Sequence, residues 1–209
     1  MEKNKGFTLM EMLVALALLV IIVGLAAFLY ARAARIRKLI TYQNDVQNVL
    51  NSIITEINFG SRDTIGLQYA HDIWKDADNT FYQLGFYDRV NEETIFYRIS
   101  PGMESGEPST TGVDTTIWQA KTRSSGIPNK WTLIDVNRSI VLVSGTGFTY
   151  YVPSNSGPIA VDNLDVDTPI IAVKIVLRGM TTDPSLKTRP VITATTLVRP
   201  KNKPPFYNK

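Results

Sequence analysis

Few residues in this sequence have the types and spacing that chemistry requires. The chain has one histidine, His71, and no cysteine, which excludes histidine metal clusters, thiolate sites and disulfides. Asp162, Asp165 and Asp167 are closely spaced carboxylates that could bind calcium, although a solvated acidic turn is the preferred interpretation. Neither a phosphate-binding glycine loop nor a nucleophile motif is present. We therefore expect no cofactor and no enzymatic activity.

Glu11 is the residue whose position needs a functional explanation. It precedes Met12–Ala31, a run of 20 residues without charge. As a helix rising about 1.5 Å per residue, this run would span about 30 Å, the hydrocarbon thickness of a bilayer. An acidic side chain costs about 2.5–3.5 kcal/mol at the centre of a membrane helix and less near the interface. A helix that served only as an anchor would gain stability by losing Glu11, unless that side chain simply reaches the interface.

The helix is predicted to extend well beyond the apolar run. A basic cluster follows the run, and then apolar residues recur with the i, i+3, i+4, i+7 spacing of an amphipathic helix. The cluster is Arg32, Arg35, Arg37 and Lys38, and the stripe is Ile36, Leu39, Ile40, Val46, Val49, Leu50, Ile53, Ile54 and Ile57. No proline precedes Pro101, and no glycine lies between Gly24 and Gly60. We predict one helix from Phe7 to about Asn58, nearly 80 Å long.

The rest of the chain has the pattern of antiparallel strands, because short β-branched and aromatic runs alternate with Gly, Pro, Asn, Asp and Ser. The predicted strands are 80–87, 94–99, 115–120, 131–136, 139–144, 148–152, 170–178 and 191–198. Ser144–Gly147 is predicted to be a hairpin turn, and Pro101–Asp114 a mobile surface loop. The expected fold class is α+β, in which the second half of the long helix covers an antiparallel sheet.

At the amino terminus, Lys5–Ala15 (KGFTLMEMLVA) resembles the signature of type IV pilins and of the pseudopilins of type II secretion. The resemblance implies a leader, Met1 to Gly6, removed by prepilin peptidase. It also implies N-methylation of the new terminal residue, Phe7. Glu11 would then set the register between neighbouring helices in a filament and neutralise the terminal charge.

The ending resembles J-type pseudopilins and W-type minor pilins more specifically. In those proteins a hairpin precedes a final strand with a basic tail, here Thr196–Asn202. The absence of cysteine departs from major pilins that close a carboxy-terminal loop with a disulfide. We therefore expect a minor subunit, at the filament tip or in an initiation complex.

The resemblance divides the chain into a leader (1–6), an apolar transmembrane and filament-core helix half (7–31), an amphipathic helix half (32–59) and a β-rich head (60–209). The partners implied are other pilin or pseudopilin subunits, prepilin peptidase and an assembly platform. The implied location is the bacterial inner membrane, with a single span and an extracytoplasmic head, and then the pilus or pseudopilus. The basic cluster alone would place the head in the cytoplasm, so this orientation rests on the family.

Two other interpretations remain open. The chain could be a permanently membrane-anchored extracytoplasmic binding module, whose helix never leaves the bilayer. It could also carry an ordinary secretory signal cut after Ala33, although such signals have apolar segments of about 7–15 residues. A net charge of +3 gives no reason to expect nucleic acid as a partner.

Overall fold

The computed structural model describes residues 8–61, 64–70, 72–74, 83–100, 102–104, 107–109, 115–123, 130–134, 140–161, 169–183, 186 and 189–201. The chain forms two compact units, Met1–Asn44 and Asp45–Lys209. The division of the chain into leader, helix halves and head remains a prediction.

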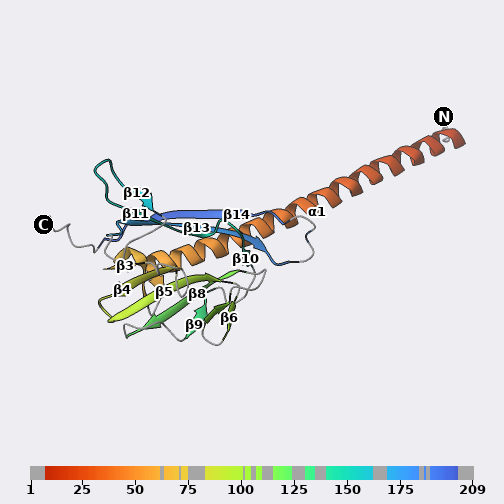
Figure 1. The fold of residues 1–209 in the computed structure, drawn as a ribbon. Helices are drawn as coiled ribbons and strands as arrows, with labels where there is room; N and C mark the ends of the chain where they lie inside the picture. The colour runs from red at the N-terminus through yellow and green to blue at the C-terminus, as the bar shows by residue number, and fades with distance from the viewer. Residues whose placement is uncertain are drawn as a thin grey trace. The chain divides into compact units, whose positions relative to one another are not determined.

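Helix α1 spans Leu9–Phe59, which confirms the long helix expected from the sequence (Figure 1). Its composition favours this length, because good helix formers such as Leu and Ala are common in it and proline is absent. The helix stops at Gly60, whose φ of 89° lies in the left-handed region that glycine adopts at little cost. The helix therefore ends within one residue of Asn58, the end predicted from the sequence.

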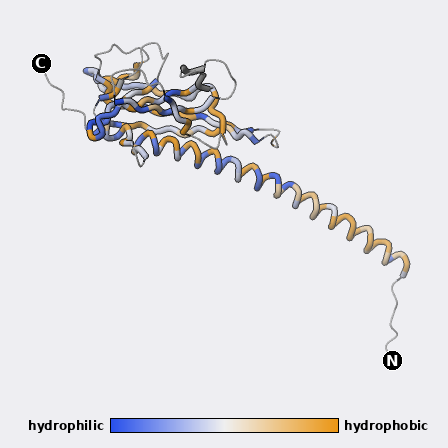
Figure 2. Tube along the Cα trace, turned by 90° about the horizontal axis from the view of Figure 1, so that it is seen from below, coloured by the Kyte–Doolittle hydropathy of each residue, from blue (hydrophilic) through white to orange (hydrophobic). Residues whose placement is uncertain are grey.

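In the first unit, α1 presents apolar side chains to its surroundings on every side. From Leu9 to Tyr30, the large apolar side chains are 54–83% exposed. Figure 2 shows that the helix is hydrophobic near its amino terminus and becomes more hydrophilic further along the chain. Ile36 and Ile40 were expected to lie on the covered stripe, but they are 50% and 48% exposed. The prediction was wrong for these two residues, which belong to the first unit rather than to the second.

The second unit contains two five-stranded antiparallel sheets. In the first sheet the order is β3-β4-β5-β8-β9. Its strands are β3 (Ile73–Trp74), β4 (Leu84–Asp88), β5 (Glu93–Ser100), β8 (Thr116–Thr122) and β9 (Trp131–Leu133). The second sheet is built around β13, which pairs with β14 and also with β10 and β11, while β12 pairs with β11. Its strands are β10 (Ile140–Leu142), β11 (Gly147–Val152), β12 (Ile159–Val161), β13 (Ala172–Thr181) and β14 (Ile192–Val198).

Alternation along β14 shows why this segment forms a strand with one covered face. Ala194 and Val198 are buried, whereas Thr193, Thr195 and Leu197 are exposed. Short elements complete the described structure: β1 (Gly60–Ser61) pairs with β2 (Thr64–Ile65), η1 is one 3-10 turn (Leu67–Tyr69), and β6 (Gly102–Glu104) pairs with β7 (Glu107–Ser109).

The predicted hairpin at Ser144–Gly147 was wrong. The two strands that flank it, β10 and β11, do not pair with each other, and both run antiparallel to β13. Leu142 is opposite Gly179 and Gly147 is opposite Val176, so residues 143–146 form a bulge against β13. Gly145, with a φ of 87°, permits the turn inside this bulge.

Two further expectations need correction. The segment Pro101–Asp114, predicted to be a loop, contains the paired strands β6 and β7. Strands β1, β2, β3 and β12 were not predicted, because alternation cannot be recognised in two or three residues. A strand is present in each of the eight predicted ranges, although residues 80–82, 135–136 and 139 of those ranges lie outside the described residues, and the α+β fold class is confirmed.

One hydrophobic core joins α1 to both sheets within the second unit. The helix contributes Val46, Leu50, Ile53 and Ile57, all at most 3% exposed, at the i, i+4, i+7, i+11 spacing of one helix face. A Cβ added at Gly179 on β13 would lie 3.1 Å from Leu50 Cδ2, which shows how closely the helix approaches the sheet. This part of the helix therefore covers the sheets, as the apolar stripe predicted.

Candidate functional site

The first turn of α1 contains three reciprocal hydrogen bonds between Thr8 and Glu11. The backbone N–H and the hydroxyl of Thr8 both donate to Glu11 Oε2, at 2.9 and 3.0 Å. In return the backbone N–H of Glu11 donates to Thr8 Oγ1 at 3.3 Å. Thr8 is the residue before the helix and Glu11 is its third residue, so the pair forms a capping box.

This arrangement gives Glu11 a favourable environment within its own chain. The first N–H groups of a helix have no partner inside the helix, and the helix dipole places partial positive charge there. The Glu11 carboxylate accepts two hydrogen bonds at this end, which offsets part of the cost of an acid beside an apolar segment. The sequence Thr8-Leu9-Met10-Glu11 has the T-x-x-E spacing of a capping box, and this signal was overlooked in the sequence analysis.

The apolar surface that follows Glu11 is the second part of the site. Helix α1 is long and apolar enough to cross a membrane, and every residue of its most apolar segment is exposed. Figure 2 shows this segment as a continuous hydrophobic stretch. Leaving so many large apolar side chains in water would be very unfavourable, since each costs roughly 1.5–3 kcal/mol relative to burial. The segment therefore needs lipid or other helices around it.

The structure does not test the other sites predicted from the sequence. Gly6 and Phe7, the predicted cleavage and methylation residues, lie outside the described residues, as do His71 and the calcium candidates Asp162, Asp165 and Asp167. Among the residues that are described, no group of three or more His, Asp or Glu side chains could hold a metal ion.

In the second unit, the buried carboxylate of Asp88 has a structural role. Asp88 ends β4 and is fully buried. Its Oδ1 accepts from the backbone N–H groups of Val90 and Asn91 at 2.9 and 3.2 Å, and its Oδ2 accepts from Asn91 Nδ2 at 2.7 Å. These bonds hold the turn between β4 and β5, which is the usual use of an aspartate at such a turn.

Comparison with known proteins agrees with this site at the amino terminus. Residues 1–27 match the family model described as the prokaryotic N-terminal methylation motif. No curated protein and no solved structure matches the chain. The match contains Gly6, Phe7 and Glu11 and supports a type IV pilin-like substrate of prepilin peptidase. Such proteins are structural subunits, and the motif and the apolar helix together fit inner-membrane anchoring with an extracytoplasmic head.

Proposed function

We propose that the chain is a minor pilin or pseudopilin, cut between Gly6 and Phe7, methylated at Phe7 and assembled into a type IV pilus or a type II secretion pseudopilus. One observation carries the proposal. A single acid, Glu11, lies at the start of an exposed apolar helix inside a matched methylation motif. An anchor needs the apolar helix, but it does not need the acid or the motif.

The mechanism follows from the exposed apolar surface of α1. In the bilayer this surface contacts lipid, and in a filament it would contact the same surface on neighbouring copies or related subunits. Contacts between unlike faces of such subunits propagate as a helical filament where the rotation from one subunit to the next does not close a ring. The apolar surface stays away from water in both states, which keeps the free-energy cost of extraction from the membrane low.

Glu11 would fix how far each helix slides along the next. Cleavage after Gly6 would create a positive amine at Phe7, four residues before Glu11. In an apolar bundle, a shift of one turn would leave this amine and the carboxylate without partners, which is costly. The capping box supports this role, because it holds the carboxylate at the helix end beside the new terminus.

The type of subunit and its position in the filament form the finer part of the proposal. The β13–β14 hairpin followed by Arg199 and Lys201 supports a J-type or W-type minor subunit, and the lack of cysteine argues against a major subunit with a disulfide-closed loop. A minor subunit of this kind would lie at the tip or in an initiation complex, with the assembly platform and other pilins as partners.

Mass spectrometry of the native mature chain tests the processing step. We expect an amino terminus at methylated Phe7. A chain that retains Met1 would contradict the proposal, and so would a chain that begins near Ile36, the result expected of a secretory signal. The variant Gly6→Val should stay uncut, and Gly24→Ala provides a control, because a Cβ added at Gly24 meets no atom within 4 Å.

Substitution of Glu11 tests the assembly step separately. Glu11→Ala should be cut and methylated but should fail to enter filaments, measured as its share of sheared filament protein. Met12→Ala is the control, since it shortens an exposed neighbouring side chain without removing charge. Incorporation of Glu11→Ala at the parental level would contradict the proposed role of Glu11.

The capping box also favours a second candidate, a permanently anchored extracytoplasmic module. If Glu11 serves only to cap the helix, it needs no partner subunit. This alternative predicts an uncut leader and a chain that stays in the membrane fraction when filaments are sheared from the cells.

A further inference from the structure

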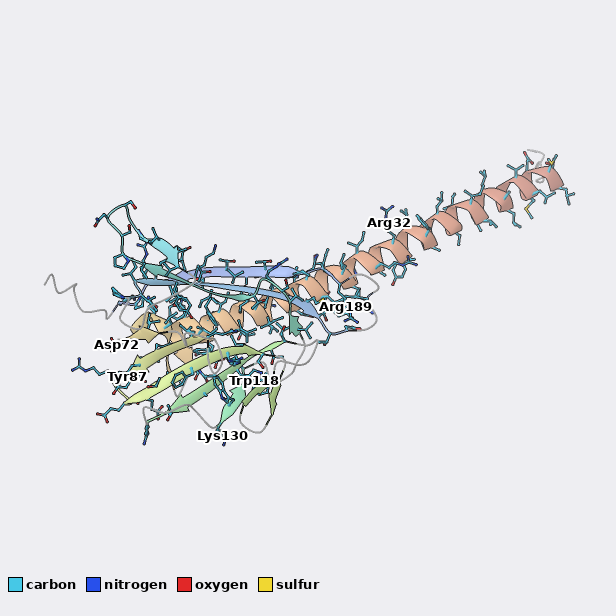
Figure 3. All side chains as sticks on the ribbon, in the orientation of Figure 1. Arg32, Asp72, Tyr87, Trp118, Lys130 and Arg189 are labelled. Atoms are coloured by element: carbon cyan, nitrogen blue, oxygen red, sulfur yellow. The ribbon has the colours of Figure 1, made fainter. Side chains whose placement is uncertain are left out.

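Four basic residues follow the apolar segment of α1, and the sequence places no acidic residue within one helical turn of any of them. We call Arg32, Arg35, Arg37 and Lys38 the cation collar. No aspartate or glutamate occurs between Glu11 and Asp45, so the usual i, i+3 and i, i+4 ion pairs along a helix cannot form here. All four side chains are exposed, and Figure 3 shows Arg32 extending away from the helix. Lys38 lies over the Tyr42 ring, with its Nζ 5.6 Å from the ring centroid.

The collar extends around more than half of the helix rather than lining one face. At about 100° per residue, Arg35 and Lys38 lie about 60° and 120° from Arg32 in one direction, and Arg37 lies about 140° away in the other. The four residues thus cover about 220° of the circumference, and the widest gap, between Arg32 and Arg37, is about 140°. A partner helix would meet cations on one side only, whereas the headgroup layer of a membrane surrounds a helix completely.

The position of the collar along the helix fits the same layer. Arg32 follows directly on the uncharged segment, and Lys38 lies about 9 Å further along. The headgroup region adds about 5–7 Å to each side of the hydrocarbon core, and long basic side chains can bend toward it. Tyr30, 79% exposed, lies at the boundary where aromatic residues of membrane helices gather.

We propose that the cation collar binds the phosphates of anionic phospholipid headgroups around the helix on the side of the head domain. This contact sets the depth at which the helix rests in the bilayer before assembly. It would offset part of the unfavourable effect of basic residues on the translocated side of a membrane protein. The inference rests on the membrane stage of the proposed function and holds whether or not the subunit later enters a filament.

The test uses the full chain with one added cysteine, because the chain has none of its own. Ala31→Cys is labelled with an environment-sensitive dye and reconstituted into phosphatidylcholine vesicles containing about 20% phosphatidylglycerol, an anionic fraction sufficient for electrostatic binding. Bromine is carried by the phosphatidylglycerol in one sample, and by an equal fraction of the phosphatidylcholine in the other. We expect at least about twofold stronger quenching by the brominated anionic lipid at low salt, with the preference declining as salt rises.

A collar variant with Arg32, Arg35, Arg37 and Lys38 all changed to Gln should lose this preference. Its matched control changes four exposed cations of the second unit to Gln, namely Arg89, Lys130, Arg189 and Arg199, and should keep it. Equal quenching by the two brominated lipids in the parent would overturn the proposal. So would the result that the collar variant keeps the preference.

The outcomes also separate this inference from the proposed function. Absence of quenching by either lipid would mean that the helix is not in the bilayer, which contradicts the membrane stage itself. Quenching without lipid preference, together with a mature terminus at Phe7, would overturn the collar proposal alone.

Discussion

The hydroxyl of Tyr150 on β11 donates a hydrogen bond to the main-chain carbonyl of Gln83, immediately before β4. The bond joins the second sheet to the first, and Tyr150 is only 2% exposed. Gln83 is held from the other side as well, since its Oε1 accepts from the backbone N–H of Ile99 at 3.1 Å and its N–H donates to the Tyr97 carbonyl at 2.9 Å. The position of the two sheets relative to each other therefore depends on polar contacts as well as on the shared core.

We predict that Tyr150→Phe lowers the free energy of unfolding by about 1–2 kcal/mol, because the carbonyl of the half-buried Gln83 loses this donor. Urea unfolding of the intact chain in detergent, followed by tryptophan fluorescence, measures the change. Tyr151→Phe is the control on the same strand, where the side chain is half-buried, and should change stability by less than about 0.5 kcal/mol. Equal effects of the two variants would show that the contact adds nothing to stability.

The turn that follows α1 requires glycine at position 66. A Cβ added at Gly66 would lie 2.2 Å from the Asn58 carbonyl oxygen and 2.3 Å from the Gly60 nitrogen, and both are backbone atoms that cannot rotate away. We expect Gly66→Ala to destabilise the second unit by more than about 3 kcal/mol and to reduce the yield of folded protein. Gly147→Ala is the control, because a Cβ there meets no atom within 4 Å. A Gly66→Ala protein as stable as the parent would show that the turn can open without cost.

Glu56 makes the stability of the second unit depend on pH. Burial raises the pKa of the Glu56 carboxyl above its ordinary value of 4.5, and the positive charge of Lys121 offsets part of this rise. The folded state thus holds the proton more tightly than the unfolded chain, so stability falls as pH increases from about 4.5 through the raised pKa. We expect Glu56→Gln to be more stable than the parent at pH 7 and to show a smaller decline over that window.

Urea midpoints measured between pH 4 and pH 7 test this expectation. Asp45→Asn is the matched control, since it removes an exposed carboxylate from the same helix. If Glu56→Gln and the parent lose stability in parallel over the whole range, another group is responsible for the pH dependence.

The helix and its covered face were predictable, because helical periodicity is a local property of the sequence. The spacing of Val46, Leu50, Ile53 and Ile57 identified the buried face before any partner was known. The same pattern included Ile36 and Ile40, which are exposed, because periodicity shows where a helix is amphipathic but not where its partner ends.

Strand pairing was less predictable, because the pairing partner lies far away in the sequence. A glycine-containing turn between two short strands, as at Gly145, is compatible with a hairpin or with a bulge. Only the position of β13, some 30 residues later, decides in favour of the bulge. At the candidate site, the position of Glu11 was clear from the sequence, and the T-x-x-E spacing could also have predicted its bonds to Thr8, because a capping box is a local pattern.

The pair Thr8 and Glu11 allows the capping and assembly roles of the acid to be separated. Thr8→Val removes the hydroxyl that bonds to Glu11 and leaves the carboxylate charge in place. Glu11→Gln removes the charge, but a glutamine at this position can still complete a capping box. Thr8→Val therefore weakens the cap and keeps the charge, whereas Glu11→Gln keeps the cap and removes the charge.

If Glu11 acts through its charge, Glu11→Gln should be cut after Gly6 but absent from filaments, whereas Thr8→Val should enter filaments at close to the parental level. If Glu11 acts only as a cap, Thr8→Val should enter filaments less well than Glu11→Gln. Thr8→Val would then free the helix terminus, at a cost of about 1 kcal/mol, while Glu11→Gln would behave like the parent. Amide exchange of residues 9–12 in micelles reports the capping effect independently of assembly, and Thr8→Ser, which keeps the hydroxyl, should match the parent in both measurements. If Glu11→Gln is absent from filaments while Thr8→Val enters them normally, Glu11 acts through contact between subunits. Loss of the cap alone would affect Thr8→Val more than Glu11→Gln, which is the opposite result.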